Sequence, residues 1–139
     1  MKVVLDTCVL KLATLPNPVN PAALIVELFL AGGLPAWASP AMIEEYKEVL
    51  SDQPELLQRT LSNLELCYPL TELDVIRHQP DNRFLECALV VPVDFIVTVN
   101  TARGHFDQQD YQGVRVLTPG AFVNLPGMQR LVQKHFGAK

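Results

Sequence analysis

The sequence predicts an α/β protein in which a central parallel sheet is covered by helices on both faces. Candidate strands alternate with candidate helices along the chain, and the strands are apolar throughout instead of alternating between apolar and polar residues. The chain has 139 residues, of which 49% are hydrophobic, so it suits one domain with a substantial core. We therefore expect a single domain over residues 1–139.

The first half of the chain begins with a short strand and continues with helices that open on proline. We expect, in order, a strand over 2–6, a turn over 15–20, a helix over 21–31, a strand over 34–38 and a helix over 41–50. Both strands are short apolar runs. Asn20 and Ser39 are N-cap residues, each followed by a proline at the first helical position, and two glycines after Ala31 end the first helix.

The second half of the chain holds the two clearest strands. We expect, in order, a helix over 54–66, a strand over 67–70, a helix over 80–90, strands over 95–99 and 114–117, a short helix from 118 and a helix over 126–136. The run FIVTV at 95–99 has the character of a central parallel strand, because it is β-branched and apolar without a charged residue.

The overall charge argues against one class of nucleic-acid-binding protein. The formal net charge is −4 and the isoelectric point is near 5.3. These values argue against a protein that grips nucleic acid through a broad basic surface. An enzyme that cuts nucleic acid with a bound cation stays open, because the cation supplies local positive charge.

Neither the N-terminus nor the cysteines indicate export. Charged residues break the apolar run at the N-terminus, and the longest apolar stretch elsewhere, Ala22–Leu34, is too short to span a membrane. No disulfide framework or zinc pattern fits the three cysteines, which are Cys8, Cys67 and Cys87. We expect free thiols in a reducing cytoplasm, with a catalytic cysteine–histidine pair as the weaker alternative.

Polar side chains follow two of the expected strands. Asp6 ends the first strand, and Asn100 follows the strand over 95–99. Because sites in parallel sheets lie beyond the carboxyl ends of the strands, both residues are candidates for a site there. The alternatives are local: Asp6 as a turn or helix cap, and Asn100 as the cap of the turn over 101–105.

Glu45 is the acid of the helix over 41–50 that flanks its apolar face. At about 100° per residue, the apolar side chains of this helix share one face. They are Met42, Ile43, Tyr46, Val49 and Leu50. Glu44 and Glu48 point away from that face and belong to a solvated surface.

Asp81 lies in the first turn of the helix over 80–90, on its buried face. That face is defined by Phe84, Leu85, Ala88 and Leu89. An acid in the first turn interacts with the helix dipole by roughly 0.3–1 kcal/mol. A plain dipole partner has no need to face the core, so the inward position favours a ligand role.

Asp6, Glu45 and Asp81 together suit a hard divalent cation. Converging carboxylates repel each other and raise their own pKa values, and a cation relieves this repulsion. Oxygen ligands favour Mg²⁺ or Mn²⁺, and the sequence shows no histidine and cysteine set that would favour zinc. An ion held this way can lower the pKa of a water for attack on a phosphodiester.

Four segments resemble the PIN-domain nucleases, in family order. VVLDTCVL resembles the opening VxDTNVL strand, and SPAMIEEYKEVL resembles the second acidic segment. DNRFLECALVVPVDFIVTVN resembles DDxFLxxAxxxxADYIVTGD, and GVRVLTPGAFV resembles the closing strand and turn. The set spans nearly the whole chain and is most similar to the group described as toxin components of toxin–antitoxin pairs.

The resemblance implies a PIN-like three-layer α/β/α sandwich and a Mg²⁺- or Mn²⁺-dependent endoribonuclease, a hydrolase that cleaves RNA phosphodiester bonds. It places metal ligands at Asp6, Glu45 and Asp81, and it adds Asn100 to the catalytic residues. The implied partners are an RNA substrate, a protein antitoxin and a second copy in a homodimer, without a membrane.

Two positions depart from the family pattern. Cys8 stands where an asparagine usually follows Asp-Thr, and Asn100 stands where an acid usually ends the VTGD strand. Asn100 can offer a carbonyl oxygen but carries no charge, and Asp94 lies at the other end of that strand. We therefore predict at most one tightly held ion and modest activity. The alternative is a catalytically weakened PIN-like domain that binds RNA or protein.

Basic residues near the acids are candidates for contacts with phosphates. Arg83, Arg103 and His105 are the expected substrate-binding residues, and Arg77 and His78 are also close in sequence. Each could equally be a solvated loop residue. The basic residues of the C-terminus are expected on an exposed face; they are Arg130, Lys134, His135 and Lys139.

Overall fold

The computed structural model describes residues 1–16 and 20–137 and contains a mostly parallel sheet. Its four central strands, in spatial order, are β1 (Val3–Leu5), β4 (Phe95–Val97), β6 (Val114–Leu117) and β5 (Asp110–Tyr111). The first three are parallel, and β5 pairs antiparallel with β6. A parallel pair, β2 (Trp37–Ala38) and β3 (Glu65–Leu66), adjoins β1 through a bridge between Val3 and Ala36.

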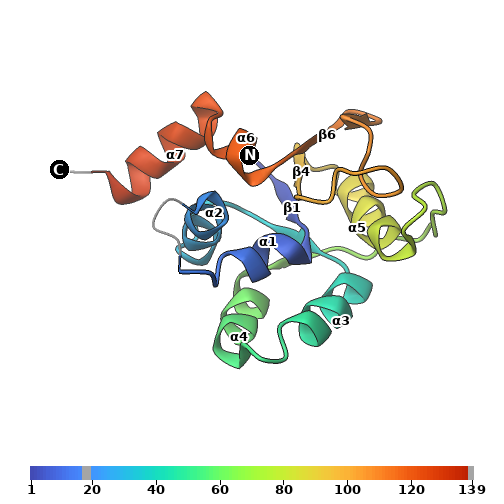
Figure 1. Ribbon diagram of the computed structural model, residues 1–139, viewed down its shortest axis with the longest axis horizontal. Coiled ribbons are helices and arrows are strands. Elements are labelled where there is room, and N and C mark those ends of the chain that lie inside the picture. Colours follow the sequence, from blue (N-terminus) through green and yellow to red (C-terminus); the bar gives the residue numbers. More distant parts are fainter. Residues whose placement is uncertain (17–19, 138–139) are drawn as a thin grey trace.

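Helices cover both faces of this sheet (Figure 1). Those in the described residues are α1 (Thr7–Leu12), α2 (Pro21–Leu30), α3 (Pro40–Val49), α4 (Pro54–Asn63), α5 (Gln79–Val90), α6 (Pro119–Val123) and α7 (Pro126–Phe136). Figure 1 shows the strands between α2 on one side and α5 on the other. Helix α5 contacts β1, β2 and β4, whereas α2 packs with α1 and α6. The predicted α/β architecture with a central parallel sheet is confirmed.

The helix starts follow from local capping chemistry. The side chains of Asn20, Ser39 and Thr118 each accept a backbone N–H from the first turn of the helix that follows. A proline occupies that turn in each case, where its missing N–H costs no hydrogen bond. The limits of α2 and α3 therefore agree with the sequence predictions to within one residue. Those of α7 agree as well, although its N-cap residue, Leu125, makes no side-chain cap hydrogen bond.

The strands differ more from the predictions than the helices do. The strand expected over 34–38 contains only Trp37–Ala38, and the one expected over 67–70 lies earlier, at Glu65–Leu66. Parallel strands exist only where a neighbour supplies hydrogen bonds, so a short apolar run does not fix their limits. The turn expected over 15–20 includes residues 17–19, which lie outside the described residues.

Two elements were not predicted. Helix α1 begins directly after Asp6, and β5 forms a hairpin with β6. The hairpin turns at Gln112 and Gly113, which have φ values of 54° and 94°. Two consecutive residues with positive φ make the tight turn whose twist suits antiparallel strands.

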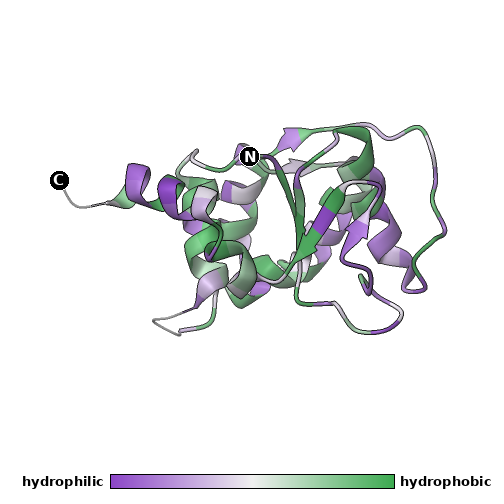
Figure 2. Ribbon diagram, turned by 90° about the horizontal axis from the view of Figure 1, so that it is seen from above, coloured by the Kyte–Doolittle hydropathy of each residue, from purple (hydrophilic) through white to green (hydrophobic). Residues whose placement is uncertain are grey.

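The core fills both sides of the sheet and anchors α3 to β1. Its largest buried side chains include Phe29, Phe84, Phe122 and Tyr46. The Tyr46 hydroxyl donates to the carbonyl of Leu5 over 2.6 Å. Figure 2 shows hydrophobic residues gathered on the strands and inner helices, and many hydrophilic residues on α7, which projects from the body.

Surface features agree in part with the sequence predictions. Arg130, Lys134 and His135 are exposed on α7, as expected, whereas Lys139 lies outside the described residues. The three cysteines are free, with two of them buried. None of the described helices is long and apolar enough to cross a membrane.

Candidate metal centre

A pocket of about 560 Å³ lies at the carboxyl ends of β1 and β4, and acids line it. The structure brings Asp6, Glu45, Asp81 and Asn100 together on its walls. They come from four parts of the chain: the residue after β1, the middle of α3, the first turn of α5 and the segment after β4. This edge of the sheet is where a parallel α/β protein places its site.

Asp6 is held in a fixed orientation by hydrogen bonds. It is 3% exposed, and its Oδ2 accepts from the Thr98 hydroxyl over 2.6 Å and from the Asn100 side-chain amide over 3.3 Å. Although Asp6 is the N-cap residue of α1, its side chain makes no capping hydrogen bond. Asp6 lines the pocket instead, so a helix-capping role for its carboxylate is wrong.

Glu45 is also held by a hydroxyl. Its Oε2 accepts from the Thr7 hydroxyl over 2.6 Å, and its side chain is half-buried. Glu44 and Glu48, on the same helix, are exposed, and Glu44 pairs with Lys47 over 3.3 Å. The facing predicted from the helical spacing is confirmed, while the ligand role of Glu45 stays a prediction.

Asp81 is a buried acid in an unfavourable environment for its charge. It is 3% exposed, in the first turn of α5. Burial and then the negative charge of Asp6 raise its pKa from 3.8 to about 6, although a hydrogen bond with His105 partly opposes the rise. A raised pKa is expected where carboxylates converge without a cation between them.

Two histidines lie beside Asp81, which the sequence did not predict as a set. The Nδ1 atom of His105 is 3.1 Å from Asp81 Oδ2, and the ring centroids of His78 and His105 are 4.6 Å apart. The expectation that no histidine set accompanies the acids is therefore wrong. Only the spacing of His78 and Asp81 could have signalled it, since His105 comes from the distant loop after β4.

Pocket residues other than the acids were also missed. Lys11, on α1, lines the same pocket, and its ammonium lies 2.7 Å from Asp52. Thr7 and Thr98 orient two of the acids. Because α1 was not predicted, nothing in the sequence pattern placed Lys11 near Asp6.

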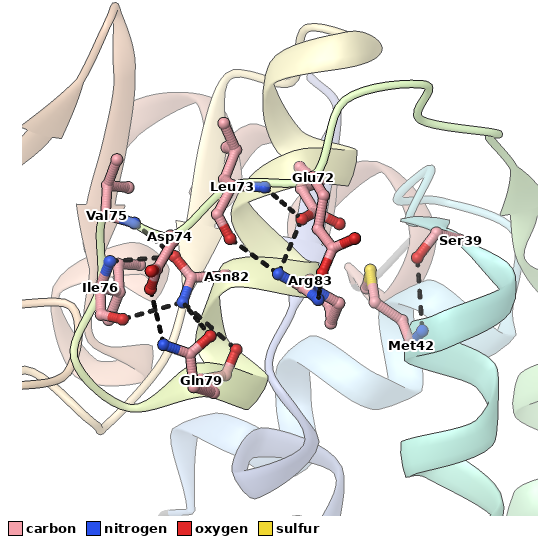
Figure 3. Close-up of polar contacts among 11 residues, drawn as sticks. Ser39, Met42, Glu72, Leu73, Asp74, Val75, Ile76, Gln79, Asn82 and Arg83 are labelled. Atoms are coloured by element: carbon pink, nitrogen blue, oxygen red, sulfur yellow. Dashed lines mark hydrogen bonds and ion pairs between the residues drawn. The ribbon is translucent and has the colours of Figure 1, made fainter.

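The predicted substrate-binding residues separate in the structure. Arg83 is turned toward the 72–73 segment: it lies 2.9 Å from Glu86 and donates to the Leu73 carbonyl over 2.8 Å (Figure 3). Arg103 is exposed in the loop after β4, and His105 lies beside Asp81. Of these three, His105 is the one that the structure brings to the acids.

The donors of the pocket fit a hard divalent cation. Three carboxylates supply the oxygen ligands that Mg²⁺ and Mn²⁺ prefer. A cation among them would also relieve the repulsion that raises the Asp81 pKa. Asn100 is turned so that its amide N–H donates to Asp6, which makes it a neutral partner of that acid.

This fold and pocket define a parallel α/β protein with acids gathered at the carboxyl edge of its sheet. The model of the PIN domain family matches residues 2–102, a segment that includes all four of the residues predicted as catalytic. The chain therefore belongs to the PIN-domain family, whose members are typically metal-dependent nucleases. No curated protein and no solved structure matches the chain.

Proposed function

We propose that this protein is a metal-dependent endoribonuclease in which Asp6, Glu45 and Asp81 hold Mg²⁺ or Mn²⁺. The observation that carries the proposal is the convergence of these acids, from three separate elements, on one pocket. Bringing carboxylates together is unfavourable without a cation, so their convergence supports a site that binds one.

The acids and the threonines beside them have separate roles in this proposal. Asp6, Glu45 and Asp81 would hold the divalent cation, which would lower the pKa of a water and stabilise charge on a phosphoryl oxygen. Thr98 and Thr7 are positioning residues, because their hydroxyls fix the carboxylates of Asp6 and Glu45. The pKa of Asp81, raised to about 6, leaves this acid ionised at neutral pH.

We also propose that residues 1–139 form one domain, although the family model ends at residue 102. β6 pairs with β4 along the central sheet, so the chain after the matched segment completes the same sheet. Phe122 and Met128 are fully buried in the same core. These contacts support a single folding unit.

The finer biological role follows from the resemblance to toxin components. We propose an RNA substrate, a protein antitoxin as partner, a homodimer and a cytoplasmic location. A small antitoxin-like reading frame immediately upstream would support this role. Co-expression with its product should restore growth that expression of this chain alone arrests, and growth unaffected by the chain would count against the toxin role.

Glutamates of one helix give a matched test of the proposed activity. Purified protein is incubated with Mn²⁺ and labelled single-stranded RNA, and cleavage is followed on gels. We expect Glu45→Gln to abolish cleavage and the same substitution at the exposed Glu44 or Glu48 to leave it unchanged. Asp6→Asn should also be inactive. Equal loss in all the glutamate variants, or none in Glu45→Gln, would refute the assignment.

A second candidate function is favoured by Asn100. Where the family usually carries an acid, this residue donates an uncharged hydrogen bond to Asp6. A catalytically weakened PIN-like domain that binds RNA or protein would need no fourth acid. RNA binding without cleavage under Mg²⁺ or Mn²⁺ would favour this function over the enzyme.

Asn100→Asp tests how much the missing charge matters. A carboxylate would replace an amide that lies 3.3 Å from Asp6, so the metal-free variant should be less stable than the wild type. With Mn²⁺, we expect higher affinity and faster RNA cleavage than in the wild type. Titration calorimetry measures the affinity, and equal affinity with equal activity in both proteins would contradict the prediction.

A further inference from the structure

We propose that His78, Asp81 and His105 form a second cation site, which takes a borderline divalent ion such as Zn²⁺. One ring nitrogen of each histidine and one carboxylate oxygen of Asp81 all lie within 4.8 Å of one another. The proposal extends the proposed function because Asp81 is shared between the two sites. The two histidines come from the segment before α5 and from the loop after β4.

One pair of the three ligand atoms already has the spacing found around a bound zinc ion. In a tetrahedral zinc site with bonds of about 2.0–2.1 Å, ligand atoms lie about 3.3 Å apart. The His105 Nδ1 atom and Asp81 Oδ2 are already 3.1 Å apart. His78 is exposed and the His105 side chain is 34% exposed, so rotation of their rings can close the remaining gap.

The two loops that carry the histidines are fixed to each other. The backbone N–H of His78 donates to the carbonyl of Gly104 over 2.7 Å, directly before His105. Gly104 has a φ of 91°, a conformation that favours glycine. Phe106 is 1% exposed, and its N–H donates to the Asn100 carbonyl over 3.0 Å. The His105 loop is thus anchored on both sides of the histidine.

The segment before His78 is held by a buried amide. The Asn82 side chain accepts from the N–H groups of Val75 and Ile76, over 3.0 and 2.9 Å, and donates to the Ile76 carbonyl over 2.8 Å (Figure 3). Asn82 is fully buried and neighbours Asp81 on α5. Ligands on fixed backbone lose little conformational entropy when an ion binds, which favours affinity.

The donor chemistry decides which ion this site prefers. Two imidazoles and one carboxylate are a common protein ligand set for Zn²⁺ when a fourth position stays open. Mg²⁺ prefers oxygen ligands and keeps several waters, so it should favour the carboxylates of Asp6 and Glu45. Because Asp81 belongs to both sets, an ion at the histidines should alter the binding of Mn²⁺ at the acids.

Direct binding to the full chain, without RNA, tests the proposal. Calorimetry with Zn²⁺ gives the affinity, and Co²⁺ replaces Zn²⁺ as a spectroscopic probe. We expect a visible Co²⁺ band of low coordination number and a loss of Zn²⁺ affinity of at least about tenfold in His78→Ala and His105→Ala. The control variants are His135→Ala, a surface histidine on α7, and Glu45→Gln, and both should bind like the wild type.

The outcomes separate this inference from the proposed nuclease. Zn²⁺ binding that survives His78→Ala but disappears in Glu45→Gln would place the ion among the acids and overturn the inference. Equal Zn²⁺ affinity in all variants, or no binding by the wild type, would overturn it as well. His78 has an exposed ring, so a folding defect should not obscure its result, and thermal unfolding checks this. Mn²⁺-dependent RNA cleavage tests the nuclease independently.

Discussion

Replacing Asp81 by asparagine should stabilise the metal-free protein at neutral pH. The Asp81 side chain is 5% exposed, and burial together with Asp6 raises its pKa from 3.8 to about 6. The folded protein therefore holds a proton on Asp81 at pH values where the unfolded chain has released it. Stability consequently falls as pH rises from about 4 to about 6, and it stays lower above that range.

The size of the Asp81 pKa shift sets how much the substitution can stabilise the metal-free protein. A rise of about two pKa units corresponds to about 3 kcal/mol of lost stability above pH 6, at about 1.4 kcal/mol per unit. At pH 4.5 the same pKa shift lowers the stability by only about 1 kcal/mol. Asparagine avoids this penalty but loses the charged hydrogen bond with His105, so about 3 kcal/mol is the upper limit of the gain at pH 8.

Urea unfolding in the presence of EDTA measures this difference. The wild type and Asp81→Asn are compared at pH 4.5 and pH 8, with Glu48→Gln as an exposed control on α3. Relative to the wild type, the free energy of unfolding of Asp81→Asn should increase by about 2 kcal/mol from pH 4.5 to pH 8. The difference between Glu48→Gln and the wild type should be the same at both pH values. A pH-independent difference, or an asparagine variant less stable at pH 8, would refute the reasoning.

Two substitutions and one labelling experiment probe residues around the site. Tyr46→Phe should cost about 1–3 kcal/mol in urea unfolding, because the Leu5 carbonyl loses a buried 2.6 Å hydrogen bond; unchanged stability would refute this. Asn82→Leu should cost at least about 2 kcal/mol and weaken Zn²⁺ binding, because the backbone before His78 loses its partners; wild-type values for both would count against the role. Burial and Asp6 raise the Cys8 pKa to about 11, so iodoacetamide should modify Cys8 slowly at pH 8 and faster toward pH 11, as mass spectrometry can show; fast modification at pH 8 would contradict the shift.

Local signals in the sequence were sufficient for most of the helices and for the facing of two acids. Cap residues such as Ser39 act within one helical turn, so they fix helix starts without help from the rest of the fold. The same holds for helical spacing, which correctly placed Glu45 beside the apolar face of α3 and Asp81 on the buried face of α5.

The parts of the site that the sequence did not reveal depend on contacts between distant segments. His105 approaches Asp81 because the loop after β4 is tied to the segment before α5. Arg83 was expected at the substrate, yet neighbouring acids and a carbonyl engage it away from the pocket. Nothing in the spacing of a single segment encodes such pairings.

The sequence by itself determined the α/β class, most of the helices and the acids that face inward, because these depend on interactions within a few residues. The tertiary structure alone decided how those acids are oriented and what surrounds them. The hydroxyls of Thr7 and Thr98 hold Glu45 and Asp6 from other elements. Burial beside Asp6 raises the pKa of Asp81. Desolvation and charge repulsion act through space, so they arise only when β1, α3 and α5 meet at one edge of the sheet.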